Sequence, residues 1–192
     1  MAQLKLIILD FDGTLVDTRY ANARAYIATL KEYGVEITER EYLDRYFGVR
    51  CMEFMRMVGF TDKYTIDQIR RRKIELYPEF FDSVKLNDAL WGWCQQMRKS
   101  GVSVWIVSTG HIDNITNVMR YLRIEDMVDG IISGDDVSQP KPSPECFMEA
   151  MRRANVSPEQ TIIYEDSAVG LEAARGSGAI YYQVTPEWFL RG

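Results

Sequence analysis

The chain has 192 residues, of which 46% are apolar, so it favours one domain, or one core domain that carries a modest insertion. The net charge of −5 and the pI near 5.0 argue against binding to nucleic acid or to an acidic membrane surface. The amino terminus resembles neither a signal peptide nor a membrane span, and we expect a soluble, cytoplasmic protein.

Strand patterns recur along the chain, with helical patterns between them. Short β-branched or aromatic runs predict strands at residues 4–9, 102–107, 130–133, 161–164 and 179–184. The first, second and fourth of these runs are typical of strands buried on both faces. Strands that alternate with helices predict a doubly wound α/β fold, in which a parallel sheet is covered on both sides. Its right-handed crossovers bring the carboxyl ends of the strands to one edge, where such sheets bind ligands.

Two of the intervening helices have recognisable ends. The segment LNDALWGWCQQMRKSG places apolar residues at spacings of four, three and four and closes on Gly101. The segment SPECFMEAMRRAN begins with Ser143 as a plausible N-cap and Pro144 at the first helical position.

One region interrupts this alternation. Residues 16–83 contain helical stretches and no convincing strand. We therefore predict an inserted helical cap over 16–83 with its own small core, and a Rossmann-like core domain formed by 1–15 and 84–192.

Metal sites built from thiolates or imidazoles have little support. The three cysteines, Cys51, Cys94 and Cys146, are scattered and lack the CxxC spacing, which also argues against a disulfide framework. The single histidine, His111, excludes a site with several histidines.

Polar side chains stand instead where the predicted strands end, or in the loop after the third strand. They are Asp10, Asp12, Ser108, Lys141, Glu165 and Asp166. Each alone has an ordinary explanation, since acid pairs often form turns or open helices and a Lys-Pro dipeptide is usually a loop. Together they supply what phosphoryl transfer needs: carboxylates for a hard cation, a nucleophile, a proton carrier, and a hydroxyl with an ammonium for phosphate oxygens.

The segments DFDGTLVDT, VSTG, KPSP and YEDSAVGLEAARGSG resemble the four motifs of the haloacid dehalogenase superfamily. The helical block stands where its phosphatase branch, which includes phosphoglycolate phosphatase-like and beta-phosphoglucomutase-like members, often carries a cap. One departure is Gln139 and Pro140 before Lys141, where many relatives have a glycine beside the lysine.

The resemblance implies roles for the acids. Asp10 would be the nucleophile that forms an aspartyl phosphate and would also bind Mg²⁺. Asp12 would act as general acid and base, and its backbone carbonyl would ligate the metal. Asp166 would be a further ligand, and Glu165 an outer or water-mediated one. Gly13 would give room for close backbone approach.

The resemblance also implies which groups hold the phosphate. Ser108, with Thr109 and Gly110, would bind phosphate oxygens, and Lys141 would offset charge on the nucleophile and the phosphoryl group. Thr14 would order the turn after the first strand.

Substrate selection would fall to the cap, which the resemblance places as a lid. Candidates for contacts with the leaving group are Arg19, Tyr20, Tyr46, Gly48 and Arg50. Arg50 could meet a second anionic group or be a solvated surface arginine. His111 could face the site or serve its own loop. Asp17 could extend the polar network or be the N-cap of the first cap helix.

Asp12 favours phosphate esters, because the dehalogenases, phosphonate-cleaving members and ion-pump ATPases of this superfamily lack an acid at this position. We therefore expect a Mg²⁺-dependent phosphatase that acts on a small phosphorylated metabolite. A sugar-phosphate mutase is the alternative, and a non-catalytic phosphate-ester binding protein is a weaker one. The sequence makes no prediction of oligomeric state.

Overall fold

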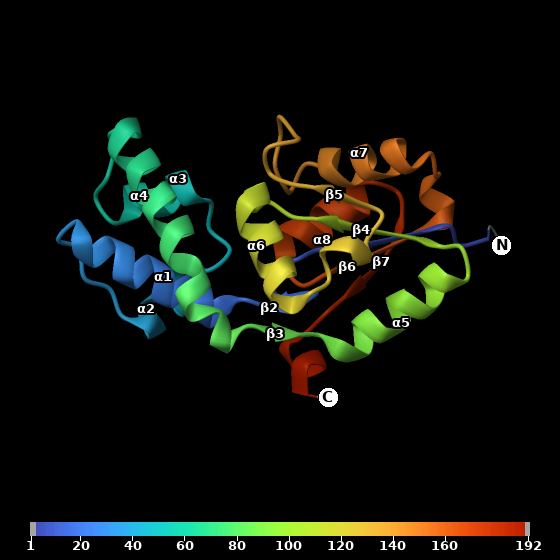
Figure 1. Ribbon diagram of the computed structural model, residues 1–192. Coiled ribbons are helices and arrows are strands. Elements are labelled where there is room, and N and C mark those ends of the chain that lie inside the picture. Colours follow the sequence, from blue (N-terminus) through green and yellow to red (C-terminus); the bar gives the residue numbers. More distant parts are fainter. Residues whose placement is uncertain (1–2, 191–192) are drawn as a thin grey trace. The chain divides into compact units, whose positions relative to one another are not determined.

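The computed structural model describes residues 3–190, which divide into two compact units (Figure 1). One unit comprises Met1–Asp17 with Lys85–Gly192, and the other comprises Thr18–Val84. We refer to them as the core unit and the cap unit.

The core unit is built on a parallel sheet, which confirms the predicted α/β fold class. Within the described residues the sheet has five strands in the order β5-β4-β1-β6-β7. The strands are β1 (Leu6–Leu9), β4 (Ser103–Val107), β5 (Gly130–Ile132), β6 (Thr161–Glu165) and β7 (Ile180–Gln183). The order places β1 at the centre, with β4 and β6 as its two hydrogen-bonded neighbours.

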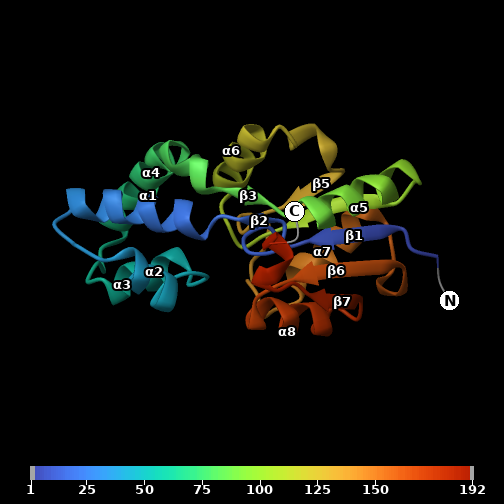
Figure 2. The ribbon, with the colours of Figure 1, turned by 90° about the horizontal axis from the view of Figure 1, so that it is seen from below.

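Helices cover both faces of this sheet. They are α5 (Asp88–Lys99), α6 (Ile112–Leu122), α7 (Glu145–Ala154) and α8 (Ala168–Gly176). Figure 1 shows α7 and α5 on opposite sides of the strands, and Figure 2 shows β1, β6 and β7 side by side. Short 3-10 turns lie in two connections, at Glu125–Met127 and Pro158–Gln160, and a third, at Pro186–Leu190, follows β7.

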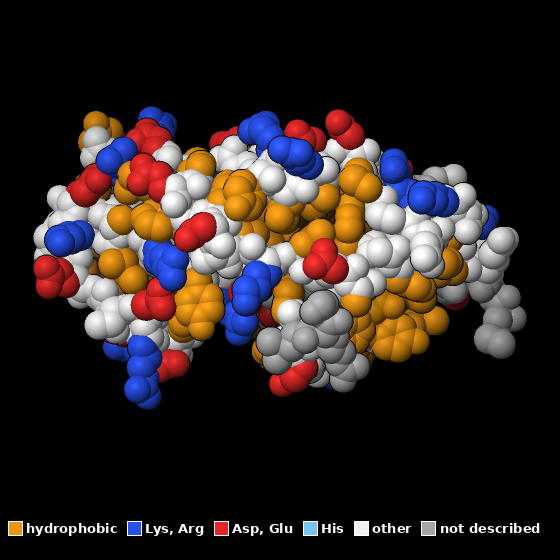
Figure 3. All heavy atoms as spheres, turned by 60° about the horizontal axis from the view of Figure 1, so that its bottom comes forward, with side chains coloured by type: hydrophobic (Ala, Val, Ile, Leu, Met, Phe, Trp, Pro, Cys, Tyr) orange, Lys and Arg blue, Asp and Glu red, His pale blue; other side chains and the backbone are white. Residues whose placement is uncertain are grey.

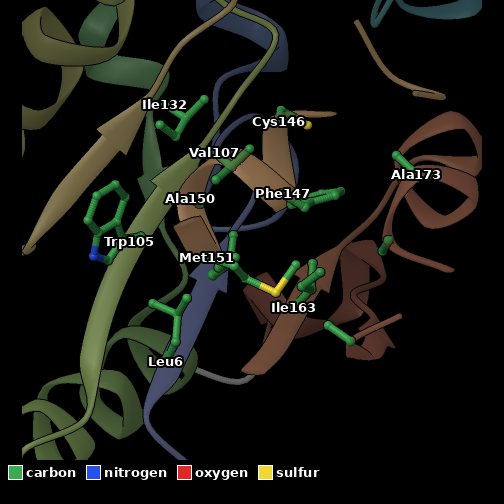
Figure 4. Packing of buried hydrophobic residues seen from close by; sticks show 13 residues of the cluster. Leu6, Trp105, Val107, Ile132, Cys146, Phe147, Ala150, Met151, Ile163 and Ala173 are labelled. Carbon is green, nitrogen blue, oxygen red and sulfur yellow. The ribbon is translucent and has the colours of Figure 1, made fainter. Parts of the chain in front are cut away.

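One face of the sheet is packed mainly by α7 (Figure 4). Phe147, Ala150 and Met151 lie three and four residues apart, so they share one face of the helix, and all three are buried. They pack in one cluster with Leu6 of β1 and Val107 of β4. This apolar layer fixes the strand ends that carry the polar residues.

Two local expectations were wrong. Strand β6 is not buried on both faces, because Ile162 and Tyr164 are only partly covered. Tyr164 stacks on Tyr182 with ring centres 5.7 Å apart and meets the Trp93 ring of α5 edge-on, also at 5.7 Å. Pro144 is the N-cap of α7 and not its first residue, although Ser143 Oγ still accepts from the Glu145 backbone N–H (3.3 Å).

The cap unit is helical and has its own core. Its helices are α1 (Arg19–Glu32), α2 (Glu39–Arg45), α3 (Cys51–Met57) and α4 (Lys63–Leu76), followed by the 3-10 segment η1 (Tyr77–Ser83). Aromatic rings fill the centre, and Phe54 contacts Tyr26, Tyr42 and Tyr46 with ring centres 4.6 to 5.6 Å apart. Large flat side chains let short helices bury enough area for a separate core.

The chain leaves and re-enters the core unit through a two-stranded ribbon that the sequence pattern did not reveal. Strand β2 (Val16–Asp17) pairs antiparallel with β3 (Lys85–Leu86). The expectation of no strand in 16–83 was therefore wrong at its first two residues. Asp17 lies in β2, and the N-cap of α1 is Thr18. Two-residue strands are too short for periodicity to be visible.

Basic and acidic side chains are mixed on the surface of the protein. On the face shown in Figure 3, lysine and arginine side chains stand among acidic ones and form no continuous basic patch. Among the described residues, no helix combines the length and the apolar character needed to cross a bilayer.

Candidate active site

The sheet register brings the predicted site residues to one edge. Leu9 of β1 is level with Ile106 of β4 and with Tyr164 of β6. The next residues along these strands are Asp10, Val107 and Glu165. Asp10 and Glu165 therefore lie at the same level on adjacent strands, and Ser108 follows one residue later on β4, so the polar residues gather where the parallel strands end.

Lys141 joins two of these carboxylates. Its Nζ lies 2.6 Å from Asp10 Oδ1 and 2.5 Å from Glu165 Oε2. All three side chains are buried, and Nζ also lies 3.5 Å from the Val107 carbonyl oxygen. A buried ammonium needs such partners, because each charge is costly to remove from water unless it is paired and hydrogen-bonded.

The second oxygen of Glu165 is held by the start of α8. Oε1 accepts hydrogen bonds from the backbone N–H groups of Asp166 and Ser167 and from the Ser167 hydroxyl, each at 3.0 Å. A Cβ on Gly170 would lie 2.0 Å from this carboxylate, so only glycine leaves room for it. Both oxygens of Glu165 are thus engaged by protein groups.

A tight turn from Phe11 to Val16 follows β1. Gly13 has a φ of +94°, and a Cβ there would lie 2.2 Å from Asp166 Oδ2. The Thr14 hydroxyl donates to Asp166 Oδ1 at 3.0 Å. The turn thereby fixes the Asp166 carboxylate from two sides, which agrees with the expected need for glycine and with the expected ordering by Thr14.

Asp12 and Ser108 share a small space beside Gly110. A Cβ on Gly110 would lie 3.2 Å from Ser108 Oγ and 3.7 Å from Asp12 Oδ2. Ser108 is buried, and its Oγ accepts from the Gly110 backbone N–H at 3.0 Å. Thr109 between them is exposed, and its carbonyl oxygen would lie 2.4 Å from a Cβ on Gly134.

The loop that carries Lys141 is held by an acid at the start of α7. The Glu145 carboxylate accepts from the backbone N–H groups of Ser138 and Gln139, both at 2.8 Å. The Ser143 N–H donates to the Pro140 carbonyl oxygen at 2.9 Å. These bonds direct the loop although no glycine stands beside the lysine.

Burial and neighbouring charges shift the pKa values of these acids in different directions. Burial, reinforced by the charge of Glu165, raises the pKa of Asp10 well above its usual value, against the opposing effect of Lys141. The same two causes raise the pKa of Asp166 to about 7. Burial would also raise the pKa of Glu165, but its ion pair with Lys141 outweighs burial and lowers it.

A divalent cation fits this arrangement. Carboxylate oxygens of Asp10, Glu165 and Asp166 lie within 4.8 Å of one another. Three carboxylates with one ammonium leave two negative charges without a counter-charge when all are ionised. Oxygen ligands at this density suit Mg²⁺, and the free oxygens of Asp10 and Asp166 are the best placed to bind it.

The raised pKa of Asp166 predicts a pH-dependent stability for the metal-free protein. Its value of about 7, against 3.8 in the unfolded chain, means that the folded state binds the proton more tightly. The associated stability is complete below pH 4 and is lost as the pH rises through 7. We expect the Tm measured in EDTA to fall between pH 5 and pH 8. In Asp166→Asn the same fall should be smaller; an equal fall in both proteins would contradict this assignment.

The cap residues expected to contact substrate have diverse surroundings in their own unit. Tyr46 is buried, and its hydroxyl donates to Glu41 Oε1 at 3.0 Å, so it serves the cap core. Arg50 is exposed and precedes α3, and Gly48 has a φ of +80° with open space around it. Arg19 and Tyr20 begin α1.

His111 serves its own loop. It is the N-cap of α6, and its Nδ1 accepts from the Asp113 backbone N–H at 3.2 Å. Its Nε2 lies 3.5 Å from Asp135 Oδ2.

Sequence reasoning missed three supporting positions. Ser167 and Gly170 hold and accommodate Glu165, and their serine-to-glycine spacing at a helix start could have suggested an N-cap. Lys73 is a buried ammonium in the cap that donates to Asn22 Oδ1 at 2.8 Å and lies 3.5 Å from the Tyr77 ring centre. It follows three arginines in the sequence, and such a run usually indicates a solvated surface.

The chain is similar in sequence and in structure to known proteins. The chain is 27% identical to a phosphorylated carbohydrates phosphatase of Thermotoga maritima, over 91% of this chain and 82% of the relative. It is 26% identical to the 6-phosphogluconate phosphatase of Escherichia coli, over 93% of this chain and 81% of the relative. The crystal structure of a beta-phosphoglucomutase from Clostridium difficile superposes with a TM-score of 0.81, at 20% identity over 98% and 88% of the two chains.

The sequence profile of the haloacid dehalogenase-like hydrolases matches residues 7–184, a span that contains all four motifs. The resemblance seen in the sequence is thus confirmed, and the chain belongs to the haloacid dehalogenase-like hydrolases.

Proposed function

We propose that the protein is a Mg²⁺-dependent phosphomonoesterase that acts through an aspartyl phosphate on Asp10. The observation that carries this proposal is the buried group of Asp10, Lys141, Glu165 and Asp166 at the carboxyl edge of the sheet. Family membership makes the chain a hydrolase. The named phosphatase relatives favour a phosphate ester as its substrate.

Lys141 prepares Asp10 for attack. The ammonium at 2.6 Å favours the ionised carboxylate, against the burial that raises its pKa. When Asp10 attacks phosphorus, the same ammonium offsets the charge that builds on the phosphoryl oxygens. Glu165 holds Lys141 in place from the other side.

Asp12 acts as general acid and base, and Ser108 binds the phosphoryl group. The Asp12 carboxyl donates a proton to the leaving oxygen, then accepts one from the water that attacks the aspartyl phosphate. Ser108 and the neighbouring backbone donate to a nonbridging oxygen in the space beside Gly110. The sequence of steps returns Asp10 and Asp12 to their starting states.

The metal would be held by the carboxylates of Asp10 and Asp166 and by the Asp12 carbonyl oxygen. Glu165 would take an outer position, because its oxygens already accept hydrogen bonds from Lys141 and from the start of α8. When bound, Mg²⁺ neutralises charge shared between the carboxylates and the phosphoryl oxygens.

The substrate class is a small phosphorylated metabolite, with sugar phosphates favoured by the relatives named above. We assign selection of the leaving group to the cap unit. There the exposed Arg50 is available for a second anionic group.

The proposal is tested by release of inorganic phosphate from p-nitrophenyl phosphate and from a panel of sugar phosphates. We expect release with Mg²⁺, none with excess EDTA, and recovery when Mg²⁺ is restored. Products are also followed by phosphorus NMR, so that a mutase would be recognised by isomer formation without net phosphate release. Full turnover in EDTA would overturn the metal-dependent mechanism, and binding without turnover of any ester would indicate a non-catalytic protein.

A further inference from the structure

Asn87 connects the returning strand of the ribbon to the turn that follows β1. It comes directly after β3 and is fully buried. Its backbone N–H donates to the Leu15 carbonyl oxygen at 2.9 Å, and its side-chain Nδ2 donates to the Thr14 carbonyl oxygen at 3.2 Å. One residue from a distant part of the sequence thus holds two successive carbonyl groups of the turn.

The same side chain also caps α5. Its Oδ1 accepts from the Leu90 backbone N–H at 3.3 Å, a bond typical of an N-cap asparagine. The amide therefore has a helix donor on one side and the turn on the other. An asparagine can satisfy both, because it offers an acceptor and a donor on one planar group.

Thr14, in the turn held by Asn87, is also hydrogen-bonded to Asp166. Thr14 is fully buried, and its hydroxyl donates to Asp166 Oδ1 at 3.0 Å. Its backbone position is set by the bond from Asn87, so the direction of that hydroxyl is set as well. A continuous path of two hydrogen bonds leads from Asn87 through Thr14 to Asp166.

We propose that Asn87 is a positioning residue for the metal site, acting through Thr14 on the Asp166 carboxylate. The inference rests on the proposed function, because it assumes that Asp166 binds Mg²⁺. Groups that orient a ligand carboxylate commonly change metal affinity by about 10–100-fold when they are removed. Because Asn87 acts through one further residue, we expect a loss of about threefold to tenfold.

Two substitutions at Asn87 separate its role as N-cap of α5 from its hydrogen bond to the turn. Asn87→Asp and Asn87→Ser both keep an oxygen that can accept from Leu90 N–H, and both lose the amide donor to Thr14. Leu90→Ala is the control, because it removes a buried side chain of α5 and keeps both hydrogen bonds from Asn87 to the turn. Mg²⁺ affinity is measured by isothermal titration calorimetry on the whole folded protein, and thermal melts report stability. We expect Kd to rise in both Asn87 variants and to stay within about twofold of wild type in Leu90→Ala.

A double-variant cycle tests the path itself. Thr14→Val removes the hydroxyl with little change of shape, and adding it to Asn87→Ser should cost little further affinity if both act through the same bond. Full additivity, or wild-type affinity in the Asn87 variants, would overturn the inference while leaving the proposed function intact. Should neither Asn87 variant fold, wild-type affinity in Thr14→Val alone would overturn it. Absence of Mg²⁺ binding in wild type would overturn both proposals.

Discussion

Asp10→Asn is expected to reduce phosphate release to background with every ester tested. The asparagine keeps the shape of the side chain but lacks the anionic oxygen that attacks phosphorus in the proposed mechanism. The variant also removes one negative charge from a buried group that Lys141 already partly neutralises, so it should remain folded. Loss of activity with a normal melt would therefore report on chemistry and not on stability.

Asp12→Asn should behave differently, because it leaves the proposed nucleophile in place. Loss of general acid and base catalysis typically costs about 10²–10⁴-fold at each step. Phosphoenzyme should then form slowly from an activated ester and decay more slowly still. Intact-protein mass after rapid acid quench should show one added phosphoryl group in this variant and none in Asp10→Asn.

A surface acid provides the control for both variants. Asp126→Asn changes an exposed carboxylate of the core unit and should retain wild-type turnover. A phosphorylated Asp10→Asn protein would contradict the assigned roles, and the two acids after β1 would then need another explanation.

Lys141→Met is expected to destabilise the protein and to remove most of its activity. The methionine has a similar length but no charge, so Asp10 and Glu165 lose the ammonium that pairs both of them. Removing one partner of a buried ion pair typically costs about 3–5 kcal/mol in the free energy of unfolding. Loss of a cation that stabilises the transition state should lower kcat by about a hundredfold or more.

The origin of that destabilisation can be tested with a second substitution. Adding Glu165→Gln to Lys141→Met removes one of the unpaired charges, so urea unfolding should show that part of the lost stability returns while activity stays low. Lys99→Met, at an exposed lysine that ends α5, is the matched control and should change stability little. A double variant less stable than Lys141→Met alone would show that charge imbalance is not the cause.

Much of the site could be predicted because its residues follow strong local signals. Asp10 and Glu165 come directly after apolar strand runs, with Asp166 as the next residue, and parallel strands must bring their carboxyl ends together. Lys141 had no strand to place it, but its motif did so through the resemblance to the family. The geometry among these residues then follows from the register of β1 and its neighbours.

The features that were missed depend on contacts between distant residues. The pairing of Val16 with Leu86 joins segments that show no strand pattern of their own. Asn87 looks like an ordinary N-cap until the Thr14 carbonyl is found beside it. Burial of Lys73 likewise depends on α1 and η1 packing around α4, which no property of its arginine-rich neighbourhood indicates.

The β2–β3 ribbon has a consequence for the order of folding. The cap unit is one continuous stretch of chain, Thr18–Val84, with a buried core of its own, so it can form before the central sheet closes. Before it forms, β1 and β4 are separated by a long flexible loop whose closure costs entropy. Once the cap has folded, the flanking strands β2 and β3 pair at Val16 and Leu86, and the long closure becomes a short one. We therefore expect that substitutions that slow folding of the cap also slow formation of the central sheet, although no strand of that sheet lies within the cap.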